Sequence, residues 1–286
     1  MSNINRNKKV AILMATYNGE RFLKRQLDSL FAQTYSEWTL YVHDDGSTDN
    51  TCEVLRSTIS IHPNMVILDL PKHLGACDGF LSMMSKIEAD YYFFCDQDDV
   101  WVPTKVEKEL DAMARLEFLH PAKPIVVYSD LRVVDPDLTP LHDSYWKMAG
   151  IYPDFFTCLS RFAASSVTTG CTMCFNHEAK KDVVYPAKSI AMHDAWVTLC
   201  CMKHGGIVSP IKEKLVLYCQ HGDNTIGAHS AENINLGYRI SHARQMFFQN
   251  KKHFAMLRSL GYSSVFKYIQ NKISYRRFIN QCLKEE

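Results

Sequence analysis

The stretch FFCDQDDVW, residues 93–101, ends an apolar run abruptly in three carboxylates within four positions. The run is short and rich in aromatic residues, which is typical of a buried strand. Neighbouring carboxylates repel one another and resist joint ionisation unless a cation or hydrogen-bond donors compensate their charge. Two interpretations follow. Either a turn holds the carboxylates of Asp96, Asp98 and Asp99 apart in water, or a positive ion binds at this strand end.

Similar units precede this strand along the chain. The apolar runs 8–16, 38–47 and 64–70 each indicate a strand, and each is followed by apolar residues at helical spacing. A further helix is expected after residue 101, because Pro103 suits the first turn of a helix. This alternation predicts an α/β protein with a mostly parallel, Rossmann-like sheet flanked by helices.

Polar segments lie where these predicted strands end. They are TYNGE, HDDGS, LPKH and DQDD. In an open parallel sheet, ligands bind in the crevice beyond the carboxyl ends of the strands. Because all four segments meet that condition, we expect a single binding site at this edge of the sheet.

The second half of the chain has a looser pattern. Residues 124–135 indicate another strand, and a mixed region follows to about residue 220. From residue 231 the apolar spacing is helical, so we expect a main domain at 1–225 and a helical C-terminal extension at 226–286 that packs on it. The extension is basic, since Lys and Arg far exceed Asp and Glu from Ser230 onward. Two interpretations of it stay open: a face that rests on anionic lipid, or a solvated face that covers the core.

Composition excludes several classes of protein. The formal net charge of +1 argues against a dedicated nucleic-acid binder. The polar start of the chain has no signal-peptide core, and no apolar run approaches the roughly 20 residues of a membrane span. Ten cysteines in such a chain favour a reducing setting, so we expect a cytoplasmic protein, free or peripheral on the inner face of the membrane. Zinc binding at Cys171-x-x-Cys174 or Cys200-Cys201 is the weaker interpretation, and buried thiols are expected.

Three ordered motifs carry a resemblance to a known family. VAILMATYNGERFLKRQLDSLFAQTY, VHDDGSTDNT and the DQDDVW strand end together resemble glycosyltransferase family 2, whose GT-A fold binds nucleotide sugars. The resemblance covers residues 8–225. The variant DQDDVW with MHDAW and YCQHGDNTIGA is similar to bacterial transferases of surface polysaccharide assembly, rhamnosyltransferases among them.

The resemblance implies a nucleotide site drawn from the strand ends. Asp44 matches the carboxylate that reads the pyrimidine base edge, and Lys72 stands near the base or diphosphate. Asp96 matches the position associated with ribose and metal. The implied nucleotide-binding set is Thr16, Tyr17, Asn18, Glu20, Asp44, Asp45, Lys72 and Asp96.

A divalent cation is implied beside that nucleotide. Carboxylates at the DQDD strand end suit Mn²⁺ or Mg²⁺, which take carboxylate, phosphate and water oxygens. By resemblance, Asp98 is the direct ligand, with Asp96 beside it, and His221 completes the metal or phosphate site. The alternatives are a solvated turn in which Asp99 caps the next helix, and a surface-loop histidine.

Asp194 in MHDAW matches the general base of the family, which removes the proton of the acceptor hydroxyl as that oxygen attacks the anomeric carbon. The alternative is a helix cap at Ala195. His193 stands where the family commonly has Glu, which leaves its role open. The remaining donor or acceptor pocket is expected from Gln97, Trp101, Trp146, Gly170, His193 and Trp196, although tryptophans are more often buried.

The sequence therefore predicts an inverting, metal-dependent glycosyltransferase. It would move one sugar from UDP- or dTDP-sugar, dTDP-rhamnose among them, to a hydroxyl of a glycan or lipid-linked acceptor. Processive relatives usually carry a Q-x-x-R-W motif, and no tryptophan here follows an arginine. Two rivals stay open: a nucleotide-sugar-binding protein without turnover, and a sugar nucleotidyltransferase, which would release pyrophosphate.

Overall fold

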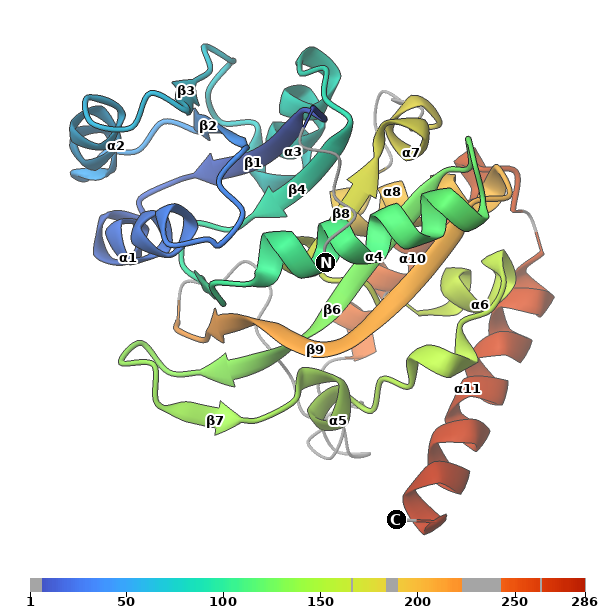
Figure 1. Cartoon of the computed structure of the whole chain (residues 1–286). Helices are drawn as coiled ribbons and strands as arrows, with labels where there is room; N and C mark the ends of the chain where they lie inside the picture. The colour runs from blue at the N-terminus through green and yellow to red at the C-terminus, as the bar shows by residue number, and fades with distance from the viewer. Residues whose placement is uncertain (1–6, 166, 184–189, 223–242, 263, 286) are drawn as a thin grey trace.

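The computed structural model describes residues 7–165, 167–183, 190–222, 243–262 and 264–285. Its centre is one sheet with the strand order β3-β2-β1-β4-β8-β6-β9-β5, to which β7 adds beside β6 (Figure 1). The strands are β1 Val10–Thr16, β2 Thr39–Asp44, β3 Met65–Ile67, β4 Tyr91–Cys95, β5 Val100–Trp101, β6 Ile125–Val134, β7 Pro140–His142, β8 Met173–Asn176 and β9 Ile207–Cys219.

Helices connect these strands and cover both faces of the sheet. The helices are α1 Glu20–Phe31, α2 Thr51–Ile59, α3 Gly75–Lys86, α4 Lys105–Leu119, α5 Tyr145–Ala149, α6 Leu159–Ala164, α7 His177–Lys181, α8 His193–Lys203, α10 Ala243–Ser259 and α11 Val265–Glu285, with short 3₁₀ turns at Pro153–Phe155 and Gly170–Thr172. In Figure 1, α4 crosses in front of the central strands, whereas α3, α8 and α10 lie behind them.

The first half of the sheet is parallel, as the alternation predicts. Strand β1 pairs in parallel with both β2 and β4, and β2 pairs in parallel with β3. The register places Thr16 opposite Asp44 and Met14 opposite Cys95. The TYNGE, HDDGS and DQDD segments therefore leave the sheet at one edge.

The second half of the sheet corrects one part of the prediction. Strand β8 runs antiparallel to both β4 and β6, and β5 runs antiparallel to β9, so the sheet is mixed. The α/β class is confirmed, but parallel pairing is less extensive than expected. The physical reason is that strand direction depends on where the chain returns to the sheet, and periodicity along the sequence carries no such information.

Alternate residues of each central strand face opposite cores. Ile12 and Met14 of β1 pack with α1, α2 and α4 on one side. Ala11 and Leu13 pack with α3 and α8 on the other. This period of two is what a strand buried on both faces requires, and it explains why the runs are continuously apolar.

The C-terminal helices belong to the second of these cores. Met256 and Leu257 of α10 are fully buried in the cluster that contains α3 and α8, and Tyr268 of α11 joins them. The hydroxyl of Tyr275 donates a hydrogen bond to the carbonyl of Gly150 at 2.7 Å. The expected packing of the tail on the main domain is thus seen. The predicted boundary at 225/226, with Tyr238 and Ile240 of the expected helices, lies outside the described residues.

Among the described helices, none combines the length and the hydrophobicity that crossing a bilayer requires.

Candidate active site

The DQDD segment clamps the loop that follows β1. The side-chain amide of Gln97 donates to the carbonyl of Tyr17 at 3.0 Å, and its oxygen accepts from the Tyr17 amide at 3.0 Å. A Cβ on Gly19 would lie 2.1 Å from the Gln97 oxygen, so only glycine leaves room for this clamp. The ring of Tyr17 stays 51% exposed, held by its backbone and free to meet a ligand.

The loops after β1 and β2 are bonded to each other in both directions. The amide of Asn18 donates to the Ser47 hydroxyl at 2.9 Å, and the Asn18 side-chain oxygen accepts from the Thr48 amide at 2.8 Å. Likewise, the Glu20 carboxylate accepts from the Asn50 amide at 2.8 Å. Asn18 adopts a left-handed conformation with φ of 46°, which asparagine tolerates better than most residues. The TYNGE and HDDGS segments therefore form one rigid surface.

Asp44 and Asp45 brace that surface. Asp44 accepts hydrogen bonds from the Ser47 hydroxyl and amide at 2.5 and 2.9 Å and from the Thr16 hydroxyl at 3.1 Å. Burial raises the pKa of Asp44, but these hydrogen bonds outweigh it and hold the pKa below its ordinary value. Asp45 accepts from the amides of Leu74 and Gly75 at the start of α3, at 2.7 and 2.8 Å.

Lys72 is exposed on the same side of the molecule. Its charge reaches the thiol of Cys52, which in turn donates to Asp44 at 3.4 Å. A cation and an exposed tyrosine therefore flank the braced carboxylates, an arrangement that suits an anionic, aromatic ligand such as a nucleotide.

The acidic cluster beyond β4 has an outer and an inner part. On the outer side, the imidazole of His221 lies 2.8 Å from the Asp98 carboxylate and stacks on Phe22 of α1 at a ring distance of 4.4 Å. On the inner side, Asp99 is fully buried and accepts from the Cys219 amide at 3.2 Å. Among the described residues, Asp99 Oδ2 has no hydrogen-bond partner.

These carboxylates perturb one another. Burial, then Asp98 and Asp194, raises the pKa of Asp96 to about 7. Burial together with Asp98 and Asp96 raises the pKa of Asp99 well above its ordinary value. Asp99 is therefore not part of a solvated turn, whereas Asp96 and Asp98 are partly exposed.

Two sets of side chains at this strand end carry atoms that could bind a divalent cation. Potential ligand atoms of Asp96, Asp99 and Cys171 lie within 4.8 Å of one another. However, burial raises the pKa of the Cys171 thiol well above its ordinary value, and a protonated soft ligand does not suit Mn²⁺ or Mg²⁺. In the second set, His221 Nε2 lies 2.8 Å from Asp98 Oδ2, and together with Asp96 these side chains offer the oxygen and nitrogen donors that such an ion could use.

Asp194 opens helix α8 behind the acidic cluster. Its carboxylate is 8% exposed and accepts from the amides of Gly170 at 3.1 Å and Ala195 at 2.6 Å. Burial raises its pKa to about 6 in spite of those hydrogen bonds. Because Asp194 in turn raises the pKa of Asp96, the two carboxylates lie close enough for their charges to interact. The N-cap of α8 is Met192, so Asp194 lies inside the first turn of the helix and is not its cap.

The ring of His193, next to Asp194, is buried between two aromatic rings. The ring stacks on Phe80 at 4.3 Å and meets Phe94 edge-on at 4.6 Å. Burial lowers its pKa to about 3, so the ring is neutral. Neither ring nitrogen has a hydrogen-bond partner among the described residues, and a Cβ on Gly170 would lie 2.9 Å from Nε2. A neutral imidazole beside a bare glycine can bond a hydroxyl that reaches it.

The tryptophans expected in the pocket lie in the core. Trp101 is 1% exposed, Trp196 0% and Trp146 8%. The ammonium of Lys105 covers the Trp101 ring at 4.2 Å, which leaves no free face for a sugar. The thiols considered for zinc are likewise buried: Cys171, Cys174, Cys200 and Cys201.

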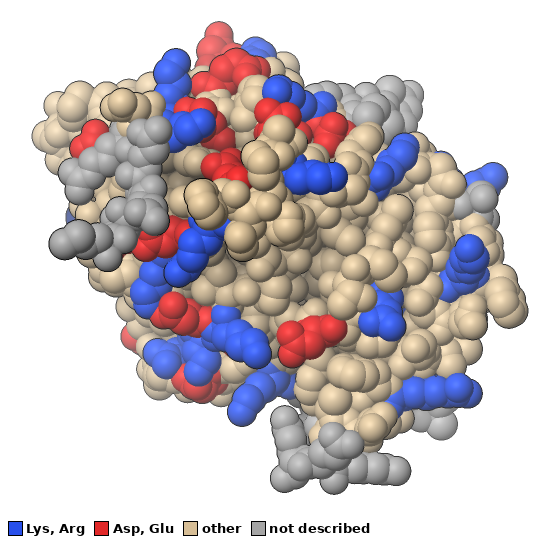
Figure 2. Space-filling model, turned by 45° about the vertical axis from the view of Figure 1, so that its right-hand side comes forward, with Lys and Arg blue, Asp and Glu red and all other residues tan. Residues whose placement is uncertain are grey.

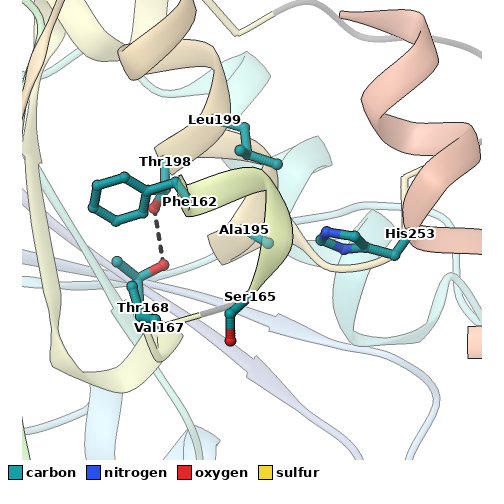
Figure 3. Close-up of a pocket in the computed structure, with 8 residues that line it drawn as sticks. All are labelled: Phe162, Ser165, Val167, Thr168, Ala195, Thr198, Leu199 and His253. Atoms are coloured by element: carbon teal, nitrogen blue, oxygen red, sulfur yellow. Dashed lines mark hydrogen bonds between the residues drawn. The ribbon is translucent and has the colours of Figure 1, made fainter. Parts of the chain in front are cut away.

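A small hollow lies between α6, α8 and α10, one turn along α8 from Asp194 (Figure 3). Thr168 and Thr198 bond across it at 2.9 Å, and His253 closes it from α10 (Figure 3). It offers about 10 Å³ to a water-sized molecule, which is room for about one water. The hollow is therefore too small for a sugar.

Sequence reasoning missed three contributors to the site. Asp99 was considered only as a helix cap within the solvated-turn alternative, but it forms the buried floor of the cluster. Phe22 stacks on His221, although the two residues are far apart in the sequence. No local sequence pattern indicates that contact. Gly19 belongs to the TYNGE motif. A glycine at this position was a sequence signal that another group, here the Gln97 side chain, packs closely against the backbone.

The sheet and the carboxylates at its strand ends define a glycosyltransferase of the GT-A type. Residues 11–151 match the model of the family described as "Glycosyl transferase family 2". This segment of the chain is a domain of that family, as its motifs predict.

Two curated relatives illustrate the similarity. The chain is 26% identical over 255 residues to the dTDP-rhamnosyl transferase RfbG of Shigella flexneri, which covers 83% of this chain and 80% of RfbG. It is 29% identical over 127 residues to the uncharacterized glycosyltransferase RP339 of Rickettsia prowazekii, covering 44% of this chain and 37% of RP339. The similarity thus extends along most of RfbG but only part of RP339.

Solved structures share the fold at lower identity. TarS 1–349 of S. aureus in complex with UDP-GlcNAc matches with a TM-score of 0.56 and 20% identity, over 76% of this chain and 60% of that one. The mannosyltransferase PcManGT of Pyrobaculum calidifontis, in complex with GDP-Man and Mn²⁺, matches with a TM-score of 0.62 and 15% identity, over 98% of this chain and 73% of that one.

Proposed function

We propose that this glycosyltransferase moves a single sugar, with inversion, from a dTDP- or UDP-sugar to a hydroxyl of a glycan or lipid-linked saccharide in bacterial surface polysaccharide synthesis. The donor we favour is dTDP-rhamnose, because the match to a dTDP-rhamnosyl transferase spans most of both chains. The observation that carries the proposal is Asp194, a buried carboxylate with a pKa of about 6, facing the acidic cluster across the ends of the strands.

The donor site would be the rigid surface made by TYNGE and HDDGS. Tyr17 would contact the base or ribose, and Lys72 would offset the charge of the diphosphate. Asp44 and Asp45 would shape the loop on which the base edge rests. Asp96, Asp98 and His221 would hold Mn²⁺ or Mg²⁺. When bound, such an ion neutralises charge on the leaving diphosphate.

Asp194 would act as the general base. A carboxylate with a pKa near 6 is ionised at neutral pH and is more basic than an ordinary aspartate, so it can accept the proton of the acceptor hydroxyl. That oxygen forms its bond to the anomeric carbon from the face opposite the diphosphate, and the bond to the diphosphate breaks. His193, whose ring nitrogens have no hydrogen-bond partner among the described residues, would bond a sugar hydroxyl.

The change Asp194→Asn tests this role. We expect transfer to fall about 10²- to 10⁴-fold, the usual contribution of a positioned base. Donor affinity should stay within about twofold, because Asn keeps the shape of the side chain. Transfer is followed by release of nucleoside diphosphate, and donor binding by thermal stabilisation with a panel of nucleotide sugars and manganese.

Asp28→Asn is the matched control, since Asp28 is an exposed aspartate on α1 that pairs with Lys24. Transfer by Asp194→Asn equal to that of the control would remove Asp194 from the mechanism.

A further inference from the structure

Helix α11 exposes an apolar stripe to solvent. Val265 is 50% exposed, Phe266 77%, Ile269 50% and Ile273 48%. Residues 265, 269 and 273 follow one another at helical spacing, so they share one face of the helix, and Phe266 lies beside them. Large apolar side chains that cluster in this way on a surface mark an interaction site more often than scattered ones do.

The opposite face of α11 packs against the rest of the molecule. Tyr275 and Phe278 pack their rings on Phe155 at 4.9 and 5.2 Å, and Tyr268 is buried in the core. The helix is therefore held in place by one face while the apolar stripe points away. Within the part of the chain that the structure describes, no other element covers that stripe.

The surroundings of the stripe are cationic. Arg276 and Arg277, in the turn that follows Ile273, are both exposed. The sequence between Glu232 and Glu285 contains no Asp or Glu. Figure 2 turns the side that carries α11 forward, and Lys and Arg lie among uncharged residues on its right half, where Asp and Glu are scarce. A partner for this surface must be both apolar and anionic.

We propose that the exposed face of α11, comprising Val265, Phe266, Ile269, Ile273, Arg276 and Arg277, docks on the surface of an anionic phospholipid bilayer. Apolar side chains of an amphipathic helix enter the boundary between headgroups and acyl chains, and basic residues are attracted by anionic headgroups. The helix lies on the outside of the molecule, as Figure 1 shows, so a flat surface can reach it. A second copy of this chain would bring like charges together, which opposes association through this face.

Sedimentation of the full chain with vesicles tests the proposal. We expect binding to vesicles of phosphatidylglycerol and phosphatidylcholine, and much weaker binding to vesicles of phosphatidylcholine alone. The triple change Phe266→Ser, Ile269→Ser and Ile273→Ser should weaken binding about tenfold or more. The double change Arg276→Gln and Arg277→Gln should weaken binding to anionic vesicles and reduce its dependence on salt.

The matched control is Phe118→Ser, which removes an 86% exposed aromatic ring from α4 and should leave vesicle binding unchanged. All these positions are exposed, so an unchanged melting temperature will show that each variant folds. Failure to bind anionic vesicles, or binding that the triple change leaves intact, would overturn the proposal. A dimer in solution that the triple change abolishes, without vesicle binding, would assign the face to a second copy instead.

This inference does not depend on the donor or the acceptor. The α11 variants should transfer sugar to a water-soluble acceptor as the unmodified chain does. Loss of docking and loss of the proposed catalytic function can therefore be told apart.

Discussion

Single carboxylates in this site behave differently because their surroundings differ. Asp44 is surrounded by donors, and its pKa lies below the ordinary value. Asp194 accepts only backbone amides in a buried position, and its pKa is raised to about 6. The pKa of Asp194 is higher folded than unfolded, so its contribution to stability is present at low pH and is lost as pH rises through about 6. At neutral pH, the ionised Asp194 therefore lowers the stability of the folded protein.

The pH dependence of transfer should report this residue. With donor and manganese saturating, we expect the rate to fall as pH drops below about 6, because protonated Asp194 cannot accept a proton. Single-turnover rates between pH 5 and 8 measure the effect. In Asp194→Asn the residual rate should lose this acidic limb. A rate that stays constant from pH 5 to 8 in the unmodified chain would contradict the assignment.

At the scale of an element, the loop after β1 depends on the segment that follows β4. Strand β4 comes three strands later in the chain but pairs directly with β1 in the sheet. Gln97 holds the Tyr17 peptide from both sides only because Gly19 has no side chain. The donor surface is therefore set by a contact between two loops and not by either loop alone.

Gly19→Ala should disrupt that contact. The added Cβ would lie 2.1 Å from the Gln97 oxygen, so the amide must move and both of its hydrogen bonds to Tyr17 weaken. We expect a loss of about 1–3 kcal/mol in the free energy of unfolding and weaker donor binding. Chemical denaturation and donor titration measure the two effects.

Gly79→Ala in α3 is the control. Its Cβ would meet His43 Cδ2 at 3.5 Å, an ordinary contact, and alanine favours a helix. Equal behaviour of the two variants would mean that the Gln97 clamp does not matter.

At the scale of the whole molecule, the C-terminal helices complete a core that begins at the first strand. Leu257 is fully buried in the cluster that contains Leu13 and Phe94. Family resemblance covered residues 8–225, but the hydrophobic core does not stop there. Stability and catalysis should therefore be linked through the tail.

Leu257→Ala should lower the free energy of unfolding by about 2–5 kcal/mol, the usual result of emptying a buried leucine site. Unfolding followed by circular dichroism and by tryptophan fluorescence should shift together, since the tail and the sheet share one core. Phe266→Ala, at a 77% exposed position, should change the unfolding free energy by less than about 0.5 kcal/mol. In Leu257→Ala, part of the circular dichroism signal could instead be lost at lower denaturant while the fluorescence transition does not shift. That result would show that the C-terminal helices unfold independently of the sheet.

Much of the fold could be predicted from the sequence. Continuous apolar runs ending in polar segments identified β1, β2 and β4, and the helical spacing identified α1 to α4, because these periodicities are local. The same reasoning placed TYNGE, HDDGS and DQDD at one edge, which the register confirms. The mixed direction of β8 and β5 could not be predicted, because it depends on how the mixed region folds back.

The sequence by itself determined which residue types stand at the strand ends, and with them the family and the residues proposed for the site. Only the tertiary structure decided how those residues are used. It buried Asp99 and the tryptophans, joined Gln97 to Tyr17 and His221 to Phe22, and set Asp194 within electrostatic reach of Asp96. The physical reason is that burial and charge interaction depend on distance in space, and these partners are far apart along the chain.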